Sequence, residues 1–525
     1  MRAYFGKESD NLKKLEKLNN LPDIVAVDVE TTTLEGEPIG LAIAPNPNEA
    51  FWFTVGEPAW REILANRKCI FFNAKFDLAK LQMDLDYEDV YLVYRIFGEE
   101  QCSLKALAWD RTMRELPTAK GLMQKYRAKS MDEVPIGEVA SMCCQHAEAT
   151  YSLWEDVKDK IPLLYHTIDK PMVKVLIDME SRGMYIDMEE LTRQLLYHKH
   201  ILEERKHQFT SAYGSINMNS PKQLVKIFGT ENTNKQTLNK LGTYAAQVLQ
   251  EYRRATKAIN TYLLPFSEVD DNNRIHCNFD YTRTGRLRSE DPNFQNLTKG
   301  ELRRIVAAPL GKALLDIDYD QLELRVLAHV AHERVMLKAF EQGKDLHATT
   351  GDALCNGNRE AGKILNFASF YGASEYKIAE LTDCTIEEGL VIKKQYESFY
   401  PDYADFVREV HKFAKDHFYV ETALGRRRKI AELTMPSFAM RSKGMREAVN
   451  TIIQGCAADI VKLAMIELDK LPLVNQIHDE LIFEMSPAEI KTEKLHIKEV
   501  CESVYPLLSG LKVEIKQGAN YETCH

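Results

Sequence analysis

Two short acidic segments, far apart in the chain, contain the residue types that bind divalent metals. In one of them, Asp479 and Glu480 separate two apolar runs, Leu471–Ile477 and Leu481–Phe483. Apolar runs of this length with alternating faces are typical of β-strands, and a polar break of this size is typical of a hairpin. We therefore expect Asp479 to lie at a hairpin tip, where its carboxylate could help to bind a metal ion.

The other acidic segment has Asp318 at the end of the apolar run Leu314–Ile317. The run predicts a buried strand, and the pattern from Gln321 to His329 predicts the helix that follows it. Two carboxylates that different strands bring to one point are what two-metal phosphoryl chemistry requires. Asp316, on the same strand face as Asp318, and Asp320 are the alternative ligands.

A third segment combines cations and aromatic rings at intervals of four residues. Arg359, Lys363, Phe367 and Tyr371 would form one slowly drifting stripe on a helix, because four residues advance about 40° beyond a full turn. Two cations at this spacing repel each other slightly, so a purely structural helix gains nothing from them. A bound triphosphate, with its several negative charges, would explain the pair.

Near the N-terminus, Asp28 and Glu30 belong to the predicted strand Ile24–Thr31. Residues two apart on a strand point to the same face, so both carboxylates can reach one metal ion. An isolated pair of this kind is usually structural.

Composition predicts a multidomain chain without a membrane segment. The 525 residues suggest roughly three to five domains, at ~100–200 residues each. No apolar run approaches the ~20 residues that span a bilayer, and the charged start lacks a signal-peptide core. Ten cysteines without the paired spacing of metal ligands indicate reduced thiols and a cytoplasmic location.

The net charge of −10 argues at first sight against a nucleic-acid partner. A groove needs only local positive potential, however, so clusters of basic residues near the acidic segments could contact phosphates. These clusters are Arg253, Arg254 and Lys257; Arg283, Arg286 and Arg288; Arg303 and Arg304; and Arg426–Lys429.

Taken together, the segments around Asp318, the Arg359–Gly372 stripe and Asp479 resemble motifs A, B and C of family A DNA polymerases. Thr284–Leu287 and Asp291–Asn296 resemble a further segment of that family. In the N-terminal third, the Asp-x-Glu pair followed by Asn73-x-x-x-Asp77 resembles the first two motifs of the 3′–5′ proofreading exonuclease found in many members.

The resemblance implies a multidomain α/β (α+β) fold. An RNase H-like exonuclease domain would be followed by a right-hand polymerase with a thumb, a palm built on an antiparallel sheet, and helical fingers. The expected ranges are 1–165 for the exonuclease-like domain, 166–270 for the thumb, 271–325 and 441–525 for the two parts of the palm, and 326–440 for the fingers. No 5′ nuclease is expected before them.

The activity that the resemblance implies is DNA-directed DNA synthesis in replication. Two Mg²⁺ ions, or Mn²⁺, would bind at Asp318, Tyr319 and Asp479, with Glu480 and Lys363 assisting catalysis. The implied contacts to the dNTP are Gln321, Glu323, His347, Arg359, Lys363, Phe367 and Tyr371. The implied contacts to the primer–template are Arg286, Arg446, Asn450, Gln454 and His478.

Two of these residues have alternative interpretations. Glu323 matches the side chain that excludes a ribose 2′-hydroxyl in this family, but it could also be an ordinary surface glutamate. His478 could contact the primer terminus or serve only as a structural partner of the acids beside it. We expect a monomer without membrane association, and a phage-type origin.

The third exonuclease motif departs from the family pattern. Met142 stands at the position of a tyrosine, and His146 at that of the aspartate that would complete the metal site with Asp28, Glu30 and Asp77. Histidine binds Mg²⁺ poorly, although it accepts Zn²⁺ or Mn²⁺. We therefore expect proofreading to be weak or absent.

Two rival functions remain open from the sequence. One is a 3′–5′ exonuclease whose C-terminal half only binds DNA, and the other is a non-catalytic DNA-binding scaffold. Retention of Asp318, Asp479, Arg359 and Lys363 beside an altered third exonuclease motif argues against both.

Overall fold

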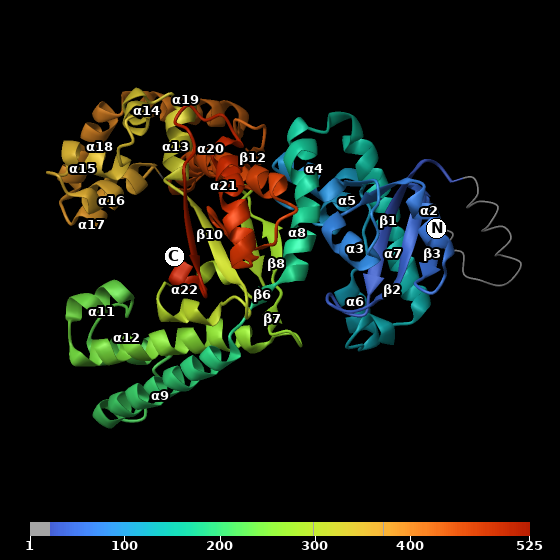
Figure 1. Cartoon of the computed structure of the whole chain (residues 1–525), viewed down its shortest axis with the longest axis horizontal. Helices are drawn as coiled ribbons and strands as arrows, with labels where there is room; N and C mark the ends of the chain where they lie inside the picture. The colour runs from blue at the N-terminus through green and yellow to red at the C-terminus, as the bar shows by residue number, and fades with distance from the viewer. Residues whose placement is uncertain (1–20, 298, 371, 525) are drawn as a thin grey trace, which may run out of the picture.

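The computed structural model describes residues 21–297, 299–370 and 372–524. Tyr371, which the sequence predicts to contact the nucleotide, lies outside the described residues. The N-terminal domain, the palm, the fingers and the thumb are separate in Figure 1, with the palm sheet at the centre.

The N-terminal domain is a mixed sheet flanked by helices, as expected for an RNase H-like fold. Its strand order is β3-β2-β1-β4-β5, with β1 (Ile24–Thr31) antiparallel to β2 (Pro38–Asn46) and parallel to β4 (Lys68–Phe71). The long helix α7 (Ile136–Val157) packs on one face of the sheet. The other elements are β3 (Glu49–Thr54), β5 (Tyr87–Asp89), α2 (Ala59–Ala65), α3 (Ala74–Leu81), α4 (Val90–Ile96), α5 (Leu104–Thr112) and α6 (Ala119–Tyr126).

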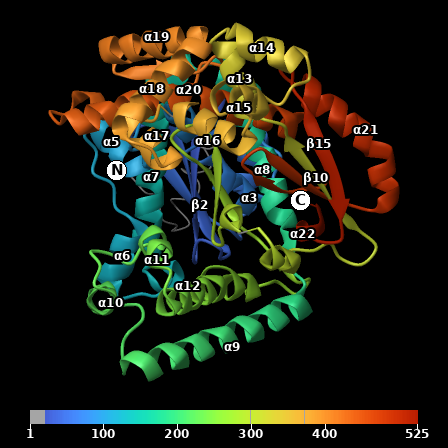
Figure 2. The same ribbon diagram turned by 90° about the vertical axis from the view of Figure 1, so that its left-hand side faces the viewer.

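The thumb consists mainly of two long helices that lie side by side, α9 (Met188–Tyr213) and α12 (Tyr244–Lys257), as Figures 1 and 2 show. A π-helical turn, Ala258–Leu263, continues α12 towards the palm. At the thumb tip, Gln236 of α11 (Lys235–Leu241) donates a hydrogen bond of 3.4 Å to Glu380 of α17 (Glu375–Thr382) in the fingers. Helix α10 (Pro221–Phe228) begins at Pro221, a residue that suits the first position of a helix.

The palm sheet has the order β13-β14-β10-β15, and all its pairs are antiparallel. The expected hairpin is formed by β13 (Leu473–Ile477) and β14 (Glu480–Met485), but every residue in both strands is buried, so the expected alternation of faces is absent. Helix α8 (Lys170–Arg182) packs against β13, and β14 lies between β13 and β10 in the sheet. The other strands are β10 (Ala313–Tyr319) and β15 (Val513–Gly518), and α21 (Pro487–Ser503) and α22 (Tyr521–Cys524) cover them.

The fingers are helical, and their helices surround a buried tyrosine cluster, Tyr396, Tyr400 and Tyr403. They comprise α13 (Leu322–Val330), α14 (Arg334–Glu341), α15 (Leu346–Leu354), α16 (Arg359–Phe370), α17, α18 (Ile386–Phe399) and α19 (Pro401–His417), followed by the hairpin β11 (Tyr419–Glu421) and β12 (Arg427–Lys429).

Helix α20 (Phe438–Glu467) connects the fingers to the palm. It is long and apolar enough to cross a membrane, but 78% of its most apolar window is buried inside the protein, as in the core helix of a globular domain. Helix α8 packs on α3 of the N-terminal domain and also on α20 and β13, so it contacts elements on both sides of the predicted boundary at residue 165. The domain ranges given from the sequence remain a prediction.

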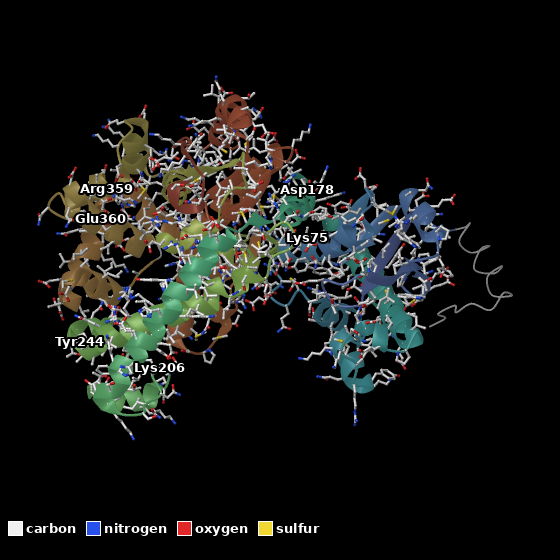
Figure 3. The ribbon with its side chains drawn as sticks, turned by 60° about the horizontal axis from the view of Figure 1, so that its bottom comes forward. Lys75, Asp178, Lys206, Tyr244, Arg359 and Glu360 are labelled. Carbon is white, nitrogen blue, oxygen red and sulfur yellow. The ribbon has the colours of Figure 1, made fainter. Side chains whose placement is uncertain are left out.

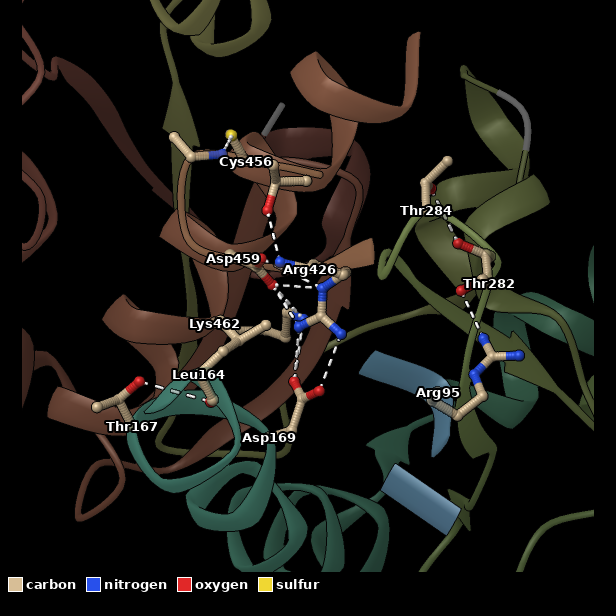
Figure 4. A network of polar contacts seen from close by, with 12 residues as sticks. Arg95, Leu164, Thr167, Asp169, Thr282, Thr284, Arg426, Cys456, Asp459 and Lys462 are labelled. Carbon is tan, nitrogen blue, oxygen red and sulfur yellow. Dashed lines mark hydrogen bonds and ion pairs between the residues drawn. The ribbon is translucent and has the colours of Figure 1, made fainter. Parts of the chain in front are cut away.

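Four buried charged side chains join α8, α20 and the β11–β12 hairpin (Figure 4). Arg426 donates two hydrogen bonds to Asp169 (2.8 and 2.9 Å) and a third to Asp459 (2.7 Å). Lys462 pairs with Asp459 (2.6 Å) and Asp169 (3.5 Å). The four charges sum to zero, and none of the side chains is more than 4% exposed.

Each charge in this network depends on the others. Burial raises the pKa of Asp169, but the opposing effect of Arg426 and Lys462 is larger and holds that pKa below its ordinary value. A buried ion pair gains little over apolar packing, yet removal of one partner leaves an uncompensated charge in the interior. The network therefore fixes the relative positions of the three segments.

Asp459→Asn is expected to lower the free energy of unfolding by about 3–5 kcal/mol, because it leaves buried Arg426 and Lys462 with one carboxylate between them. Urea unfolding measures the loss. The matched control is Asp405→Asn, which breaks the exposed pair with Arg408 and should cost at most about 1 kcal/mol. Equal losses in the two variants would contradict the role given to the network.

Candidate active site

Asp318 and Asp479 lie next to each other at one end of the palm sheet. Asp318 is near the end of β10, and Asp479 is in the turn between β13 and β14. The backbone N–H of Tyr319 donates to the C=O of Asp479 (3.3 Å), and Asp318 faces Glu480 across the two strands. His478 has a φ of 59°, which suits a two-residue hairpin turn. The sheet itself therefore positions the two predicted aspartates.

The carboxylates in this region repel one another. Burial, then Asp479 and Glu480, raise the pKa of Asp318 to about 7. Burial, with Glu323 and Glu480, raises the pKa of Asp479 to about 6, and Arg286 opposes this rise. A divalent cation would relieve the repulsion, and a set of carboxylate oxygens fits the hard ions Mg²⁺ and Mn²⁺.

The remaining acids of the segment have other contacts. Glu480 is buried, and its Oε2 accepts a hydrogen bond of 2.6 Å from Tyr521 of α22. Asp316 is also buried, and burial together with Glu480 raises its pKa to about 8. Asp320 pairs with Arg325 (3.0 Å). Glu480 and Asp316 are thus buried and Asp320 is paired, whereas Asp318 and Asp479 are half-buried beside each other.

Arg286 and Glu323 form an ion pair beside the two aspartates. The Glu323 side chain is only 13% exposed, so the interpretation of Glu323 as an ordinary surface residue is wrong. Arg286 follows Gly285, which has a φ of 84° and packs against the Arg426 side chain so closely that a Cβ would lie 2.5 Å from its Nε. The glycine thus connects the position of Arg286 to the buried charge network.

Helix α16 presents the predicted stripe at the fingers surface. Lys363 and Phe367 are exposed, and Arg359 and Glu360 project from the same end of the fingers in Figure 3. Arg359 pairs with Asp345 (2.7 Å) and Glu360 (3.2 Å). The expectation that the two cations gain nothing from a structural role is therefore wrong for Arg359, although its side chain remains 50% exposed.

Sequence reasoning missed Asn366, which lies on the buried side of α16 and contacts His347. The Nδ2 of Asn366 donates to the C=O of Leu346 (3.4 Å) and to Nδ1 of His347 (3.1 Å). Its Oδ1 accepts hydrogen bonds from the hydroxyls of Thr350 (2.9 Å) and Tyr396 (3.2 Å). A polar residue at an apolar helix position, next to a predicted contact, was the signal available in the sequence.

This network fixes the protonation of His347. A carbonyl oxygen can only accept, so the Leu346 contact sets the orientation of the Asn366 amide, and Nδ1 of His347 must then be an acceptor. Burial lowers the pKa of His347, and Arg359 and Lys363 act in the same direction, while Asp345 and Asp320 oppose it. The imidazole is therefore neutral, with its proton on Nε2. Its ring lies 5.5 Å from that of Phe367.

The predicted DNA contacts on α20 are accessible, whereas several basic residues are not. Arg446, Asn450 and Gln454 are half-buried along one helix face, and His478 is exposed. Two arginines from the basic clusters are buried, which contradicts their role as phosphate contacts: Arg303 lies over the Tyr521 ring, and Arg426 belongs to the buried network. Arg253 is half-buried and donates hydrogen bonds to Thr233, and its role as a phosphate contact remains a prediction.

A second acidic site lies in the N-terminal domain, between β1 and α7. The Nδ1 of His146 lies 3.7 Å from Asp28 Oδ2 and 3.9 Å from Glu30 Oε1. Burial and the nearby Asp28 raise the pKa of Glu30 to about 8. Asp77 is buried, and its Oδ1 accepts a hydrogen bond from the backbone of Val29 (3.0 Å). The structure thus brings His146 to the carboxylates, as the third-motif alignment implies.

The four-part architecture and the aspartate pair on the palm define a polymerase of the right-hand type. A family model described as DNA polymerase family A matches residues 187–523, and the chain belongs to this family. The structure is similar to a solved POL domain of Pol1 from M. smegmatis in complex with DNA primer-template and dNTP. The TM-score is 0.86 at 25% identity, and the match covers the whole of both chains.

Curated relatives are longer than this chain. DNA polymerase I of Borreliella burgdorferi is 28% identical over 95% of the chain and 62% of its own length. DNA polymerase I of Chloroflexus aurantiacus is 30% identical over 97% of the chain and, again, 62% of its own length. A thermostable DNA polymerase I of Thermus thermophilus is 31% identical over 69% of the chain and 49% of its own length.

In ¹⁵N-histidine NMR spectra at neutral pH, His347 is expected to show the Nε2–H neutral tautomer. Asn366→Asp would place a carboxylate against Nδ1, raise the pKa of His347 and give an imidazolium signal. Asn356→Asp, at an exposed loop position, is the matched control and should leave the spectrum of His347 unchanged. If the spectrum of the unmodified protein shows protons on both ring nitrogens of His347, the residue is an imidazolium, and the assignment of the neutral Nε2–H tautomer is wrong.

Proposed function

We propose that the chain is a DNA-directed DNA polymerase that extends a primer 3′-end from dNTPs during replication. The observation that carries the proposal is the hydrogen-bonded junction of β10 with the β13–β14 turn, which places Asp318 beside Asp479. The similar POL domain of Pol1 from M. smegmatis is in complex with DNA primer-template and dNTP, which supports the same substrates for this chain.

Asp318, Asp479 and the carbonyl of Tyr319 would hold two Mg²⁺ ions. Bound there, the ions would lower the pKa of the primer 3′-hydroxyl and stabilise the leaving pyrophosphate. Arg359 and Lys363 would bind the phosphates of the dNTP from α16. His347, neutral and with Nε2–H as its donor, would add a hydrogen bond without adding charge.

The other predicted residues would select the substrates. Phe367 would stack near the sugar and base, and Glu323 would occupy the space of a ribose 2′-hydroxyl while Arg286 holds it in place. Arg446, Asn450 and Gln454 would contact the minor groove, where acceptors are nearly the same for every base pair. The enzyme would act as a monomer in the cytoplasm, and its N-terminal site would have weak or no proofreading activity in Mg²⁺.

Asp479→Ala is expected to reduce primer extension in Mg²⁺ by roughly three orders of magnitude, because the loss of a metal ligand removes several kcal/mol of transition-state stabilisation. Extension of a labelled, recessed duplex measures the loss. Asp405→Asn, at the exposed position used above, should retain full activity. If the primer shortens and never grows in the unmodified protein, the nuclease interpretation replaces this proposal.

Phe367→Tyr is expected to relax discrimination against dideoxynucleotides by about tenfold, the value of one added hydrogen bond in a desolvated site. The tyrosine hydroxyl can replace the missing sugar hydroxyl, and the ring, which is 37% exposed, has room for it. The ratio of kcat/KM for dNTP and ddNTP measures the effect. An unchanged ratio would show that the stripe on α16 does not contact the sugar.

A further inference from the structure

Four side chains with metal-binding atoms converge in the N-terminal domain. Asp28 and Glu30 come from β1, and Cys143 and His146 come from α7, which packs across that strand. Atoms of Asp28, Glu30 and Cys143 all lie within 4.8 Å of one another, and Nδ1 of His146 is 3.7–3.9 Å from both carboxylates. Cys143 is not part of the exonuclease pattern, and sequence reasoning did not select it.

The distances from Nδ1 of His146 to the two carboxylates suit a shared ion better than direct bonding. A tetrahedral site with metal–ligand bonds of ~2.0–2.3 Å places its ligand atoms roughly 3.3–3.8 Å apart. The separations from His146 to the carboxylates are close to this range and too long for hydrogen bonds. Among the described residues, buried Asp28 Oδ2 has no hydrogen-bond partner, as expected of an oxygen that faces an ion.

His146 has the surroundings of a metal ligand. Its Nε2 lies 2.9 Å from the carbonyl oxygen of Pro117, which can only accept, so Nε2 carries a proton. Metal-ligating histidines almost always donate their second ring N–H to a carbonyl or a carboxylate. This contact leaves Nδ1 directed towards Asp28 and Glu30.

The donor set does not suit the ion expected at such a site in this family. Mg²⁺ requires oxygen ligands in near-octahedral geometry, whereas imidazole and thiolate prefer borderline or soft metals. The Sγ of Cys143 lies 3.2 Å from the backbone carbonyl of Asp28, which keeps the sulfur beside the carboxylates. The Oδ1 of Asp77 accepts a hydrogen bond from the backbone N–H of Val29. The proposed set of metal ligands is therefore two carboxylates, one imidazole and one sulfur.

We propose that Asp28, Glu30, Cys143 and His146 form a binding site for a Zn²⁺-class transition-metal ion that discriminates against Mg²⁺. On binding, the Cys143 thiol loses its proton to solvent, and the sulfur becomes the fourth ligand. In place of the all-oxygen set expected for a hard ion, the site offers carboxylate, imidazole and thiolate ligands, each of which binds Zn²⁺. The proposal concerns metal binding by the N-terminal domain and does not depend on primer extension.

Cobalt(II) is the probe, because it replaces Zn²⁺ and reports its ligands by absorption. Chelator-treated full-length protein is titrated with Co²⁺ in excess Mg²⁺, which occupies the palm site. The expected result is one tightly bound Co²⁺ with a thiolate-to-cobalt charge-transfer band, which Zn²⁺ then removes. Cys143→Ala should lose the band, and Cys144→Ala is the matched control that should keep it, because Cys144 is an adjacent buried thiol outside the cluster.

His146→Asp tests the metal preference separately. It replaces the imidazole with an oxygen ligand and is expected to weaken Co²⁺ binding more than tenfold, and to allow Mg²⁺-dependent shortening of a primer in the absence of dNTPs. Primer extension by each variant shows that the chain is folded, and it separates failure of this proposal from failure of the proposed function. No charge-transfer band, or a band that persists in Cys143→Ala, would overturn the proposal and leave His146 as the ion-pair partner of the carboxylates.

Discussion

The relative arrangement of α8, α20 and the β11–β12 hairpin depends on one buried network of charges, formed by Arg426, Lys462, Asp169 and Asp459. Its members come from the residue before α8, the β11–β12 hairpin and the C-terminal third of α20, so the network can form only in one relative placement of these elements. Apolar contacts tolerate small shifts, but buried charges lose several kcal/mol when their partners move away. The position of the α20 face that carries Arg446, Asn450 and Gln454 is set in this way.

In the palm, by contrast, charges of the same sign lie close together. Burial raises the pKa values of Asp318 and Asp479, and repulsion from neighbouring carboxylates, including Glu480, raises them further. The sheet holds them together because the hydrogen bonds of β10, β13 and β14 and the burial of the flanking apolar residues outweigh the repulsion. The electrostatic cost thus falls at the place where a cation could reduce it.

Individual strands and helices could be predicted from the sequence better than the contacts between side chains of different elements. Strands β1, β10, β13 and β14 and helix α16 were predictable, because an apolar run or a four-residue period is a local signal. The pairing of Arg359 with Asp345, the burial of Arg303 and Arg426, and the loss of alternation in β13 and β14 were not, because each depends on contacts with another element of the fold. Cys143 and Asn366 were missed for the same reason: their roles come from neighbours on another element.

The hydrogen bond between Gln236 and Glu380 connects the tip of the thumb to the tip of the fingers. An exposed bond of this kind contributes about 1 kcal/mol or less, so thermal motion breaks and remakes it readily. In the proposed function, this bond would not prevent a duplex from entering from the side, but it would enclose a bound duplex while it is made. Release of the duplex would then require either movement along its own axis or opening of this contact.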